Sequence, residues 1–459
     1  MSSISSIVCK FGGTSVGAKE KIEQIVKILK LDPRRKAVVL SAPGKAEGVS
    51  TKVTDYLISI VNKSLAGKDI EKDVAGVKGR YYDIYQSLGL TRETIDGVLK
   101  RLDERIAADK GNSEKYRDAI VASGEDLNAE LFAIYANTVG IKAKFVSPID
   151  VGLIVTANFG DARVKSEGSA NLIKLRDYIN EGFVVIFPGF FGVSADGDIV
   201  TFSRGGSDLT GALVADAINA SEYENWTDVN GILSANPKII ENPEQIDALT
   251  YREMRELSYM GFGVFHEEAV KPVMKKKIPI RLRNTNNLEN RGTLIAFERI
   301  PEERTVVGIA AASGFCSFNL QKFLMNREMG FGRKLLQIFE DFGLSYEQCP
   351  SGVDNISVVL NQKQKLLCSD MVNDLIREIE KELKPDLFKT EYNLSLVAVV
   401  GEGLKNQTGV LGVAAAALAN AGVNIKIVNQ GSSELSIIFG IESADETRAV
   451  KALYEAFFS

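Results

Sequence analysis

Two pairs of adjacent glycines in this chain each stand beside a cation and a hydroxyl side chain. The first pair lies in the run Lys10-Phe-Gly12-Gly13-Thr14. Adjacent glycines let the backbone approach an anion because no Cβ is in the way, and their N–H groups can hold phosphate oxygens. A lysine next to them can neutralise the charge that develops on a transferring phosphoryl group. These residue types at this spacing indicate phosphate binding or phosphoryl transfer.

The second pair adds a carboxylate to the same set of groups, in the run Arg204-Gly-Gly-Ser207-Asp208. The first run is not a P-loop, since Ala18 follows Gly17 where that motif requires lysine. A single glycine pair could simply form a tight turn between a strand and a helix, and this alternative stays open for either run taken alone. Two such runs in one chain favour a phosphate site.

The elements that must position these residues alternate through the first 300 residues. Short apolar runs predict strands over residues 7–11, 37–41, 143–145, 184–188 and 223–227. Apolar residues at helical spacing predict helices over residues 20–31, 51–64, 168–180 and 209–219. Helices also dominate residues 70–137, a long insertion that could close over a substrate. The alternation predicts an α/β fold, a three-layer αβα sandwich around a mainly parallel sheet, with substrates at the carboxyl ends of the strands.

The pattern changes after residue 301 into two units that each run strand, helix, strand, strand, helix. The first unit spans 315–321, 330–342, 345–349, 355–361 and 367–383, and the second spans 395–400, 408–421, 424–428, 435–439 and 445–458. A ferredoxin-like unit needs a sixth strand. Residues 386–391 can complete the first unit, and residues 305–311 are the strand available to the second. We therefore expect two interleaved units, with two independent domains as the alternative.

Composition excludes several classes of function. The formal net charge of −5, from 55 basic and 60 acidic residues, gives no electrostatic basis for binding nucleic acid or an anionic membrane. The basic run at residues 275–277 is interpreted as a solvated helix end, a nucleic-acid patch being the alternative. His266 is the only histidine, so neither a histidine-rich metal centre nor a Ser-His-Asp triad is expected.

The four cysteines are scattered without a C-x-x-C pair, which fits reduced thiols in a cytoplasmic protein. We expect no secretory signal at the N-terminus. The longest apolar stretch, residues 410–423, is shorter than the ~20 residues that span a bilayer.

These segments together resemble the aspartokinase branch of the amino-acid kinase family. The matching runs are Lys-Phe-Gly-Gly-Thr-Ser-Val at 10–16, Ser41-Ala42, Ser123-Gly124-Glu125, Arg-Gly-Gly-Ser-Asp at 204–208 and Trp-Thr-Asp-Val-x-Gly-Ile at 226–232. Near the end, Val-Gly-Glu-Gly at 400–403 and Gln-Gly-Ser-Ser-Glu at 430–434 are typical of the second ACT domain in that family. The resemblance covers essentially the whole chain.

The resemblance implies a kinase domain over residues 1–300, a first ACT domain over 301–391 and a second over 392–459, with the strand 305–311 contributed to the second. Because nothing follows Ser459 in this sequence, a monofunctional enzyme is expected. The implied reaction is phosphorylation of the β-carboxylate of L-aspartate by ATP, the first step toward lysine, threonine and methionine through diaminopimelate. Mg²⁺ would be held mostly by phosphate and water. A carboxylate with a pKa near ~3.9 needs no general base at neutral pH, so the scarcity of histidine is no objection.

The resemblance also assigns roles to individual residues. Lys10 contacts the transferring phosphoryl group, and Asp208 orients that lysine. The implied aspartate site consists of Ser41, Thr54, Glu125, Arg204 and Ser207. Within it, Arg204 pairs with a substrate carboxylate and Glu125 accepts the ammonium group. The implied ATP-binding residues are Lys10, Gly12, Gly13, Thr14, Ser207, Thr227, Asp228 and Lys238, and no residue is assigned to a metal.

Alternatives accompany these assignments. Thr51 competes with Thr54 for the same role, and Glu125 and Glu130 could instead lie on a solvated helix face. Near the nucleotide the sequence departs from the common family pattern, so the ribose and base contacts stay open. The departures are Leu233 for Tyr, Asn236 for Asp, Lys238 for Arg, Gly263 for Lys and Glu267 for Pro.

Paired ACT domains imply feedback by an end-product amino acid, with lysine expected first and threonine as the alternative. The implied effector residues are Met325, Gly330, Phe331, Ser345 and Glu347. Met325 and Phe331 could instead be simple core residues. Pairing of ACT domains across subunits implies a homodimer or a dimer of dimers.

Two rival functions stay in view, a non-catalytic amino-acid sensor and a kinase acting on glutamate or acetylglutamate. Retention of Lys10, Arg204 and Asp208 together argues against the sensor. The first glycine run and the paired ACT units favour aspartate over the other acceptors, although one methylene alone gives only about 10–200-fold discrimination.

Overall fold

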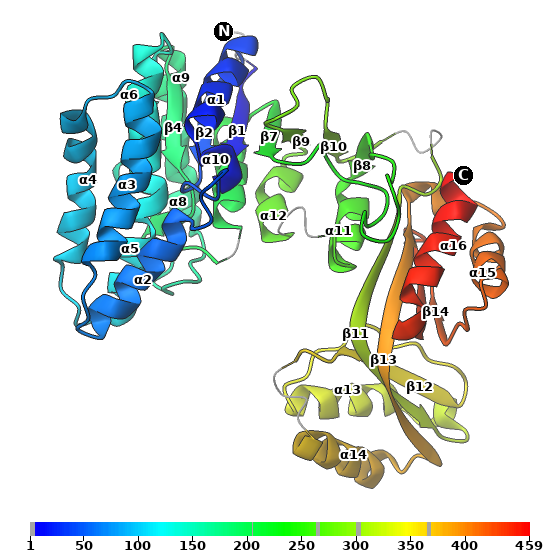
Figure 1. Ribbon diagram of the computed structural model, residues 1–459. Helices are drawn as coiled ribbons and strands as arrows, with labels where there is room; N and C mark the ends of the chain where they lie inside the picture. Colours follow the sequence, from blue (N-terminus) through cyan, green and yellow to red (C-terminus); the bar gives the residue numbers. More distant parts are fainter. Residues whose placement is uncertain (1–4, 204, 263–266, 300–303, 365–368) are drawn as a thin grey trace. The chain divides into compact units, whose positions relative to one another are not determined.

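The computed structural model describes residues 5–203, 205–262, 267–299, 304–364 and 369–459 (Figure 1). The chain forms two compact units. The first unit contains residues up to Ile232 together with Gln245–Tyr251 and Gly263–Arg299. The second contains Leu233–Glu244, Arg252–Phe262 and Ile300–Ser459. Within the described ranges, every helix is too short or too polar to cross a membrane.

An eight-stranded sheet runs through the first unit in the order β3-β4-β2-β1-β7-β9-β10-β8. Its strands in chain order are β1 (Ile7–Phe11), β2 (Arg35–Leu40), β3 (Ala143–Phe145), β4 (Val184–Pro188), β7 (Glu222–Thr227), β8 (Ala248–Thr250), β9 (Ile280–Asn284) and β10 (Thr293–Ala296). Neighbouring strands from β3 to β9 are parallel, and β10 is antiparallel to β9 but parallel to β8. The predicted mainly parallel sheet is confirmed.

Side chains of β1 point alternately to the two faces of this sheet, because successive residues of a strand do so. Cys9 and Phe11 join a buried apolar cluster with α1 (Lys19–Leu31) and α6 (Ser123–Thr138). Lys10 points to the opposite face, where it meets α10 (Gly206–Ile218). Helices therefore cover both faces, which confirms the three-layer αβα sandwich.

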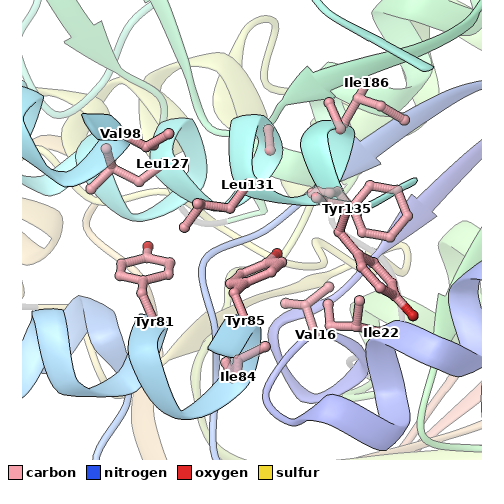
Figure 2. Packing of buried hydrophobic residues seen from close by; sticks show 14 of the residues in the cluster. Val16, Ile22, Tyr81, Ile84, Tyr85, Val98, Leu127, Leu131, Tyr135 and Ile186 are labelled. Atoms are coloured by element: carbon pink, nitrogen blue, oxygen red, sulfur yellow. The ribbon is translucent and has the colours of Figure 1, made fainter. Parts of the chain in front are cut away.

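The helix predicted over residues 51–64 is present as α2 (Val53–Leu65), and the predicted helical insertion of residues 70–137 is present as α3 (Glu71–Ser87), α4 (Arg92–Ile106), α5 (Ser113–Val121) and α6. These helices continue the core beyond the sheet. Tyr81 and Tyr85 of α3 point at α6, where Leu127 and Leu131 face them (Figure 2). The phenol of Tyr81 donates to the carbonyl of Gly124 at 2.7 Å. A polar tip on an apolar ring thus satisfies a backbone group inside the core.

The rest of the first unit consists of short elements. They are the 3-10 turn η1 (Gly13–Ser15), α7 (Pro148–Val151), α8 (Ser166–Asn171), η2 (Leu172–Lys174), α9 (Leu175–Asn180), α12 (Glu267–Lys275) and the hairpin of β5 (Phe191–Val193) and β6 (Ile199–Thr201). The single helix predicted over residues 168–180 is thus divided into three pieces.

The second unit contains a five-stranded antiparallel sheet in the order β12-β11-β13-β15-β14. Its elements are α11 (Tyr251–Tyr259), β11 (Gly308–Gln321), η4 (Met325–Arg327), α13 (Phe331–Asp341), β12 (Asn355–Asn361), α14 (Ser369–Leu383), β13 (Leu387–Val400), η5 (Glu402–Leu404), α15 (Val410–Asn420), β14 (Ile427–Asn429), β15 (Ser436–Glu442), η6 (Ser443–Asp445) and α16 (Glu446–Phe458). Tyr251, the first residue of α11, is counted with the first unit.

The strands β11 and β13 are shared between the two predicted ferredoxin-like units (Figure 1). Residues 308–313 of β11 pair with 395–400 of β13, which in turn pair with β15 of the second predicted unit. Residues 315–321 of β11 pair with β12 of the first. The strand that precedes the first unit is therefore built into the sheet of the second, as interleaving requires. Each pair of separately predicted strands is one continuous strand.

One predicted strand of this region is absent. Residues 345–349 form no strand, although Gln348 makes a single bridge to Val359. The other elements of both units agree with the prediction within a few residues, save that residues 367 and 368 of the predicted helix lie outside the described ranges.

Candidate active site

The carboxyl ends of four adjacent parallel strands meet at one edge of the eight-stranded sheet. Backbone hydrogen bonds continue between the loops that follow these strands. Gly12 N donates to Trp226 O at 3.2 Å, Ser41 N donates to Phe11 O at 3.2 Å, and Gly189 N donates to Leu40 O at 3.0 Å. The loops after β1, β2, β4 and β7 are thereby fixed side by side, which is where open α/β sheets bind their ligands.

Lys10 and Asp208 form an ion pair at this edge. Nζ of Lys10 lies 2.6 Å from Oδ1 of Asp208, and both side chains are largely buried. Asp208 stands in the first turn of α10, where backbone N–H groups and the helix dipole favour negative charge. The predicted catalytic pair is thus brought together by a strand end and a helix start that are distant in sequence.

The first glycine run lies directly beside that ammonium group. A Cβ on Gly12 would lie 3.6 Å from Nζ of Lys10. Gly13 packs against Gly44 of the next loop so closely that a Cβ on Gly44 would come within 2.7 Å of the Gly13 carbonyl carbon. Gly13 and Thr14 form the turn η1, with Thr14 exposed. A backbone surface next to a cation is suited to a phosphate group.

Arg80 of α3 binds the backbone of the loops that follow β1 and β2. Its Nη2 donates to the carbonyl of Gly17 at 2.8 Å and to that of Gly44 at 3.0 Å. The side chain is buried, and burial lowers the pKa of its guanidinium. The helical insertion thereby holds the loops after β1 and β2 together.

Ser207 stands on the same turn of α10 as Asp208 and is buried. It packs against the loop after β4, because a Cβ on Gly189 would come within 2.5 Å of the Ser207 hydroxyl. The next residue, Phe190, has a φ of 79°, which non-glycine residues rarely adopt, and its N–H donates to Thr210. The second glycine run is thus seated against a strained loop at the same edge of the sheet.

Residues of α6 and α2 that are predicted to bind the substrate aspartate also gather at this edge. Glu125 lies at the start of α6 and accepts a hydrogen bond from the backbone N–H of Ala42, the residue after Ser41. A Cβ on Gly124 would lie 2.7 Å from the Cβ of Ala42 and 3.7 Å from Cγ1 of Val53, at the start of α2. Thr54 follows Val53 in the first turn of α2. Glycine at 124 therefore permits the close contact that joins these elements.

Glu125 is not on a solvated helix face, since its side chain is buried. Burial raises the pKa of its carboxyl to about 8. Glu130, by contrast, forms an ion pair with Arg101 and is partly exposed. The alternative that the sequence left open is thus wrong for Glu125. A buried carboxyl with a raised pKa is a characteristic of functional sites.

The start of α6 is held in place by arginines of α4. Nη2 of Arg105 lies 2.6 Å from Oδ2 of Asp126, and Arg101 Nε lies 3.1 Å from the same oxygen. Arg105 also donates to the hydroxyl of Ser123 at 2.9 Å. Because Asp126 follows Glu125 directly, these ion pairs fix the turn that carries the predicted ammonium acceptor.

Thr227 and Asp228 stand at the end of β7, and the hydroxyl of Thr227 donates to Oδ1 of Asp228 at 3.2 Å. Thr285 N donates to Thr227 O at 2.9 Å, and the Thr285 hydroxyl lies 2.7 Å from that of Ser15. The end of β7 is thus linked through Thr285 to the turn that follows the first glycine run. This is the predicted nucleotide side of the site.

A buried ionic network lies on the opposite face of the same strands. Both carboxylate oxygens of Glu224 accept from Arg35, at 2.7 Å and 2.9 Å, and Arg283 donates to Oε1 at 3.4 Å. Trp226 Nε1 and the Cys9 thiol also donate to Glu224, at 2.9 Å and 3.2 Å. This network joins β1, β2, β7 and β9 on the face of the sheet opposite Lys10.

Several residues predicted for the site lie outside the first unit or outside the described residues. Arg204, Gly263 and His266 lie outside the described residues. Lys238, Leu233 and Asn236 belong to the second unit, where Lys238 is exposed. In the part of the chain that the structure describes, no group of three or more His, Cys, Asp or Glu side chains could hold a metal ion.

The predicted effector residues lie in the second unit, in the part of the chain between β11 and β12. Met325 and Phe331 are buried in an apolar cluster with residues of α13 and β12. Gly330 has a φ of 80° and begins α13, where it is exposed. Ser345 donates from N to Gln364 at 3.0 Å. Glu347 accepts a hydrogen bond from the phenol of Tyr259, on α11.

Sequence reasoning missed four kinds of supporting residue. They are Arg80, the pair Arg101 and Arg105, the buried acid Glu224 and the amide Asn225. Asn225 and Glu224 had a signal, since both are polar residues in a strand predicted to be buried. The arginines had none, because charged residues on predicted helices are usually solvated.

Comparisons with known proteins identify the family of the chain. The model of the Amino acid kinase family matches residues 5–284, and a model of the ACT domain matches residues 397–457. The chain is 46% identical over 452 residues to Aspartokinase 3 of Bacillus subtilis (strain 168), an alignment that covers 98% of each chain.

Solved structures give the same relationship. The aspartate kinase of Clostridium acetobutylicum, described as an allosteric enzyme, has a TM-score of 0.85 and 36% identity over 98% of this chain and 100% of that one. E. coli aspartokinase III, solved with aspartate and ADP, has a TM-score of 0.75 over 99% and 100% of the two chains, and its 24% identity supports the fold alone. With the family model matching more than half of its residues and a 46% identical relative along nearly its full length, this chain belongs to the aspartokinase branch of the amino acid kinase family.

Proposed function

We propose that this chain transfers the γ-phosphoryl group of ATP to the β-carboxylate of L-aspartate and so forms 4-phospho-L-aspartate. The observation that carries the proposal is the ion pair of Lys10 and Asp208, 2.6 Å apart beside the first glycine run. A fixed cation beside a glycine backbone without Cβ atoms is suited to phosphoryl transfer, because catalysis there consists mainly of positioning and charge stabilisation.

In this proposal the phosphates of ATP lie along Gly12, Gly13 and Thr14, with Ser207 on the other side. Thr227, Asp228 and Lys238 are assigned to the nucleotide. The first set is supported by the backbone bonds of Gly12 to the end of β7 and of Gly189, beside Ser207, to the end of β2, at the carboxyl edge of the sheet. Lys238 rests on the family resemblance.

The acceptor, aspartate, is bound by Glu125 of the insertion together with residues from neighbouring elements. Glu125 accepts the ammonium group of aspartate, Arg204 pairs with a carboxylate, and Ser41, Thr54 and Ser207 supply hydroxyl groups. The assignment is supported by the burial of Glu125 and by its hydrogen bond from the N–H of Ala42. The ordinary carboxylate of aspartate is ionised at neutral pH, so it attacks without a general base.

The transfer step forms a bond between a β-carboxylate oxygen and the γ-phosphorus. The bond from that phosphorus to the β,γ-bridging oxygen breaks, and ADP leaves with the bonding electron pair. Lys10 stabilises the negative charge on the transferring group, while Asp208 holds the lysine in place. Interactions that strengthen in the transition state raise kcat rather than lower KM.

Mg²⁺ enters, in this proposal, as the ATP complex, held by phosphate and water. The described residues provide no set of three acidic, histidine or cysteine side chains for a metal. The proposal assigns no residue to the metal, because Mg²⁺ usually keeps several waters and binds through phosphates.

Regulation is proposed to reside in two ACT domains, residues 301–391 and 392–459, following a kinase domain of residues 1–300. The relative from Clostridium acetobutylicum is described as allosteric at 36% identity. We place an end-product amino acid, lysine first and threonine second, at Gly330, Ser345 and Glu347, with Met325 and Phe331 as the apolar floor. A homodimer or dimer of dimers assembled through these domains, in the cytoplasm, completes the proposal.

The test is a coupled assay of ADP release with aspartate, glutamate, acetylglutamate or no acceptor. Aspartate alone should support turnover, and lysine or threonine should reduce the rate. A chain that binds amino acids but releases no ADP with any acceptor would be a sensor. A higher kcat/KM for glutamate would identify the rival kinase.

A further inference from the structure

Lys10 and Asn225 are partners across two neighbouring parallel strands. The register of β1 and β7 sets the Cα of Lys10 against that of Asn225. Both side chains point to the face of the sheet that α10 covers, since the residues on either side, Cys9 and Glu224, meet on the opposite face. The first turn of α10 brings Asp208 between them.

The same carboxylate oxygen of Asp208 receives both side chains. Nδ2 of Asn225 donates to Oδ1 at 2.9 Å, and Nζ of Lys10 lies 2.6 Å from that oxygen. An ionised carboxylate only accepts, so the amide must present its NH₂ group to it. Asn225 is 4% exposed, and its rotamer is therefore restricted by packing.

A second contact from β7 fixes the backbone of the same turn. The phenol of Tyr223 donates to the carbonyl of Asp208 at 3.1 Å. The backbone at this position is thus held independently of Asn225. What the amide adds is a constraint on the carboxylate itself.

We propose that Asn225 is a positioning residue for phosphoryl transfer, acting through Asp208 on the ammonium group of Lys10. The proposal rests on the proposed function of that lysine. The ion pair alone fixes the distance between the two groups but leaves the carboxylate free to turn about its bond to Cβ. The hydrogen bond from the amide of Asn225 removes that freedom, so the lysine keeps its place beside Gly12.

An amide suits this place better than the other residue types. A leucine of similar size would leave Oδ1 with one donor fewer, and an aspartate would set a second carboxylate against the first. A buried polar group that meets a partner in a charged pair specifies one geometry, which an apolar neighbour does not. Asn225 donates to the carboxylate of Asp208 without adding charge, whereas Tyr223 of the same strand donates to the backbone carbonyl.

The test is a double-mutant cycle with Asn225→Leu and Asp208→Ala, measured as kcat and KM for both substrates. Asn225→Leu should lower kcat by about 10-fold or more and leave both KM values within about twofold, as expected for an interaction that acts in the transition state. In the Asp208→Ala background the same substitution should lower kcat no further, because its effect passes through that carboxylate. Asn171→Leu, which removes a comparable amide bond to the carbonyl of Gly152 at 2.9 Å, is the control and should keep the wild-type kcat.

Asn225→Asp serves as the second variant if Asn225→Leu does not fold. It keeps the shape of the side chain, removes the donor, and should also lower kcat with little change in KM. Wild-type kcat in a folded Asn225→Leu or Asn225→Asp variant overturns the proposal. Equal effects of Asn225→Leu with and without Asp208 also overturn it, since they indicate a purely structural role. Failure of the proposed function would differ from both outcomes, because the wild-type chain itself would then release no ADP with aspartate.

Discussion

The guanidinium of Arg80 lies 2.8 Å from the carbonyl oxygen of Gly17, three residues beyond the first glycine run. The same nitrogen reaches the carbonyl of Gly44 at 3.0 Å. A residue of the helical insertion, which also carries Glu125, thus holds the loop that we assign to phosphate.

Arg80→Met should therefore weaken ATP binding more than it weakens aspartate binding. Hydrogen bonds from a charged donor contribute about 1.5–3 kcal/mol, which as a loss in ATP binding corresponds to a rise of about 10- to 160-fold in KM for ATP. The control is Lys78→Met on the same helix, which removes an ion pair to Asp103 at 2.8 Å near the surface and should change KM less than twofold. A wild-type KM for ATP in folded Arg80→Met would remove this anchor from the account.

Glu125 predicts the pH dependence of aspartate binding. Burial raises the pKa of its carboxyl to about 8 in the chain without substrate. Only the ionised carboxylate can pair with the substrate ammonium group, so KM for aspartate should fall as pH rises toward about 8, by about tenfold per pH unit below it. Glu125→Gln should raise KM and make it independent of pH over this range. A pH-independent KM in the wild-type chain would contradict the role of Glu125.

The raised pKa of Glu125 also makes stability depend on pH. Aspartate binding should strengthen as pH rises, whereas stability should fall. A raised carboxyl pKa means that the folded chain binds more protons than the unfolded chain between the ordinary value of 4.5 and about 8. The free energy of unfolding should therefore fall as pH rises through this window, and Glu125→Gln should lessen the fall. Urea titrations at several pH values measure both slopes.

Glu224 should matter for stability rather than for catalysis. Its burial would raise the pKa, but the hydrogen bonds and charge of Arg35 hold the carboxyl below its usual range. Removing one partner of a buried ion pair costs about 3–5 kcal/mol, so Glu224→Ala should lower the free energy of unfolding by that amount. Trp226, the only tryptophan, donates to Glu224, and its fluorescence reports the unfolding of this core.

The pair can be examined by a double-mutant cycle with Arg35→Met. The loss in Glu224→Ala/Arg35→Met should be smaller than the sum of the two single losses, because neither charge is then left without its partner. A loss below about 1 kcal/mol in Glu224→Ala would indicate that the network is solvated rather than buried.

Much of the fold and part of the site follow from the sequence. The strands that end in glycine runs were predictable, because Lys10 and Asp208 each stand at a change from one periodicity to another. Their 2.6 Å contact was not predictable, since it depends on the register of β1 against β7 and on the seat of α10. Local patterns determine elements, whereas register and packing determine which side chains meet.

The arginine anchors were missed for a related reason. Arg80 is buried because two loops distant in sequence present their carbonyls to it, and no local pattern contains that information. The long strands β11 and β13 were predicted as separate pieces, since Gly314 and Asn393 break their apolar patterns. Both positions have a positive φ, with irregular pairing near Gly314 that bends the strand without ending it.

Glu347 gives the prediction for regulation. Its carboxylate accepts a hydrogen bond from Tyr259 of α11, so an effector ammonium group would have to share or displace that donor. Glu347→Ala should raise the concentration of lysine needed for half-inhibition by about tenfold or more, because a hydrogen bond to a charged group contributes about 1.5–3 kcal/mol, without changing the uninhibited rate. Lys363→Ala, an exposed residue in the same unit, is a suitable control. An unchanged inhibition curve in Glu347→Ala would exclude this pocket.

The central claim is that Lys10 promotes phosphoryl transfer to the β-carboxylate of aspartate, and trapping the product with hydroxylamine tests it most directly. An acyl phosphate reacts to a hydroxamate, whose position on aspartate is read by mass spectrometry. The account predicts β-aspartyl hydroxamate in step with ADP release from the wild-type chain, and its loss in Lys10→Ala that keeps the wild-type Trp226 fluorescence. ADP release without the hydroxamate, or wild-type product formation by Lys10→Ala, would contradict it.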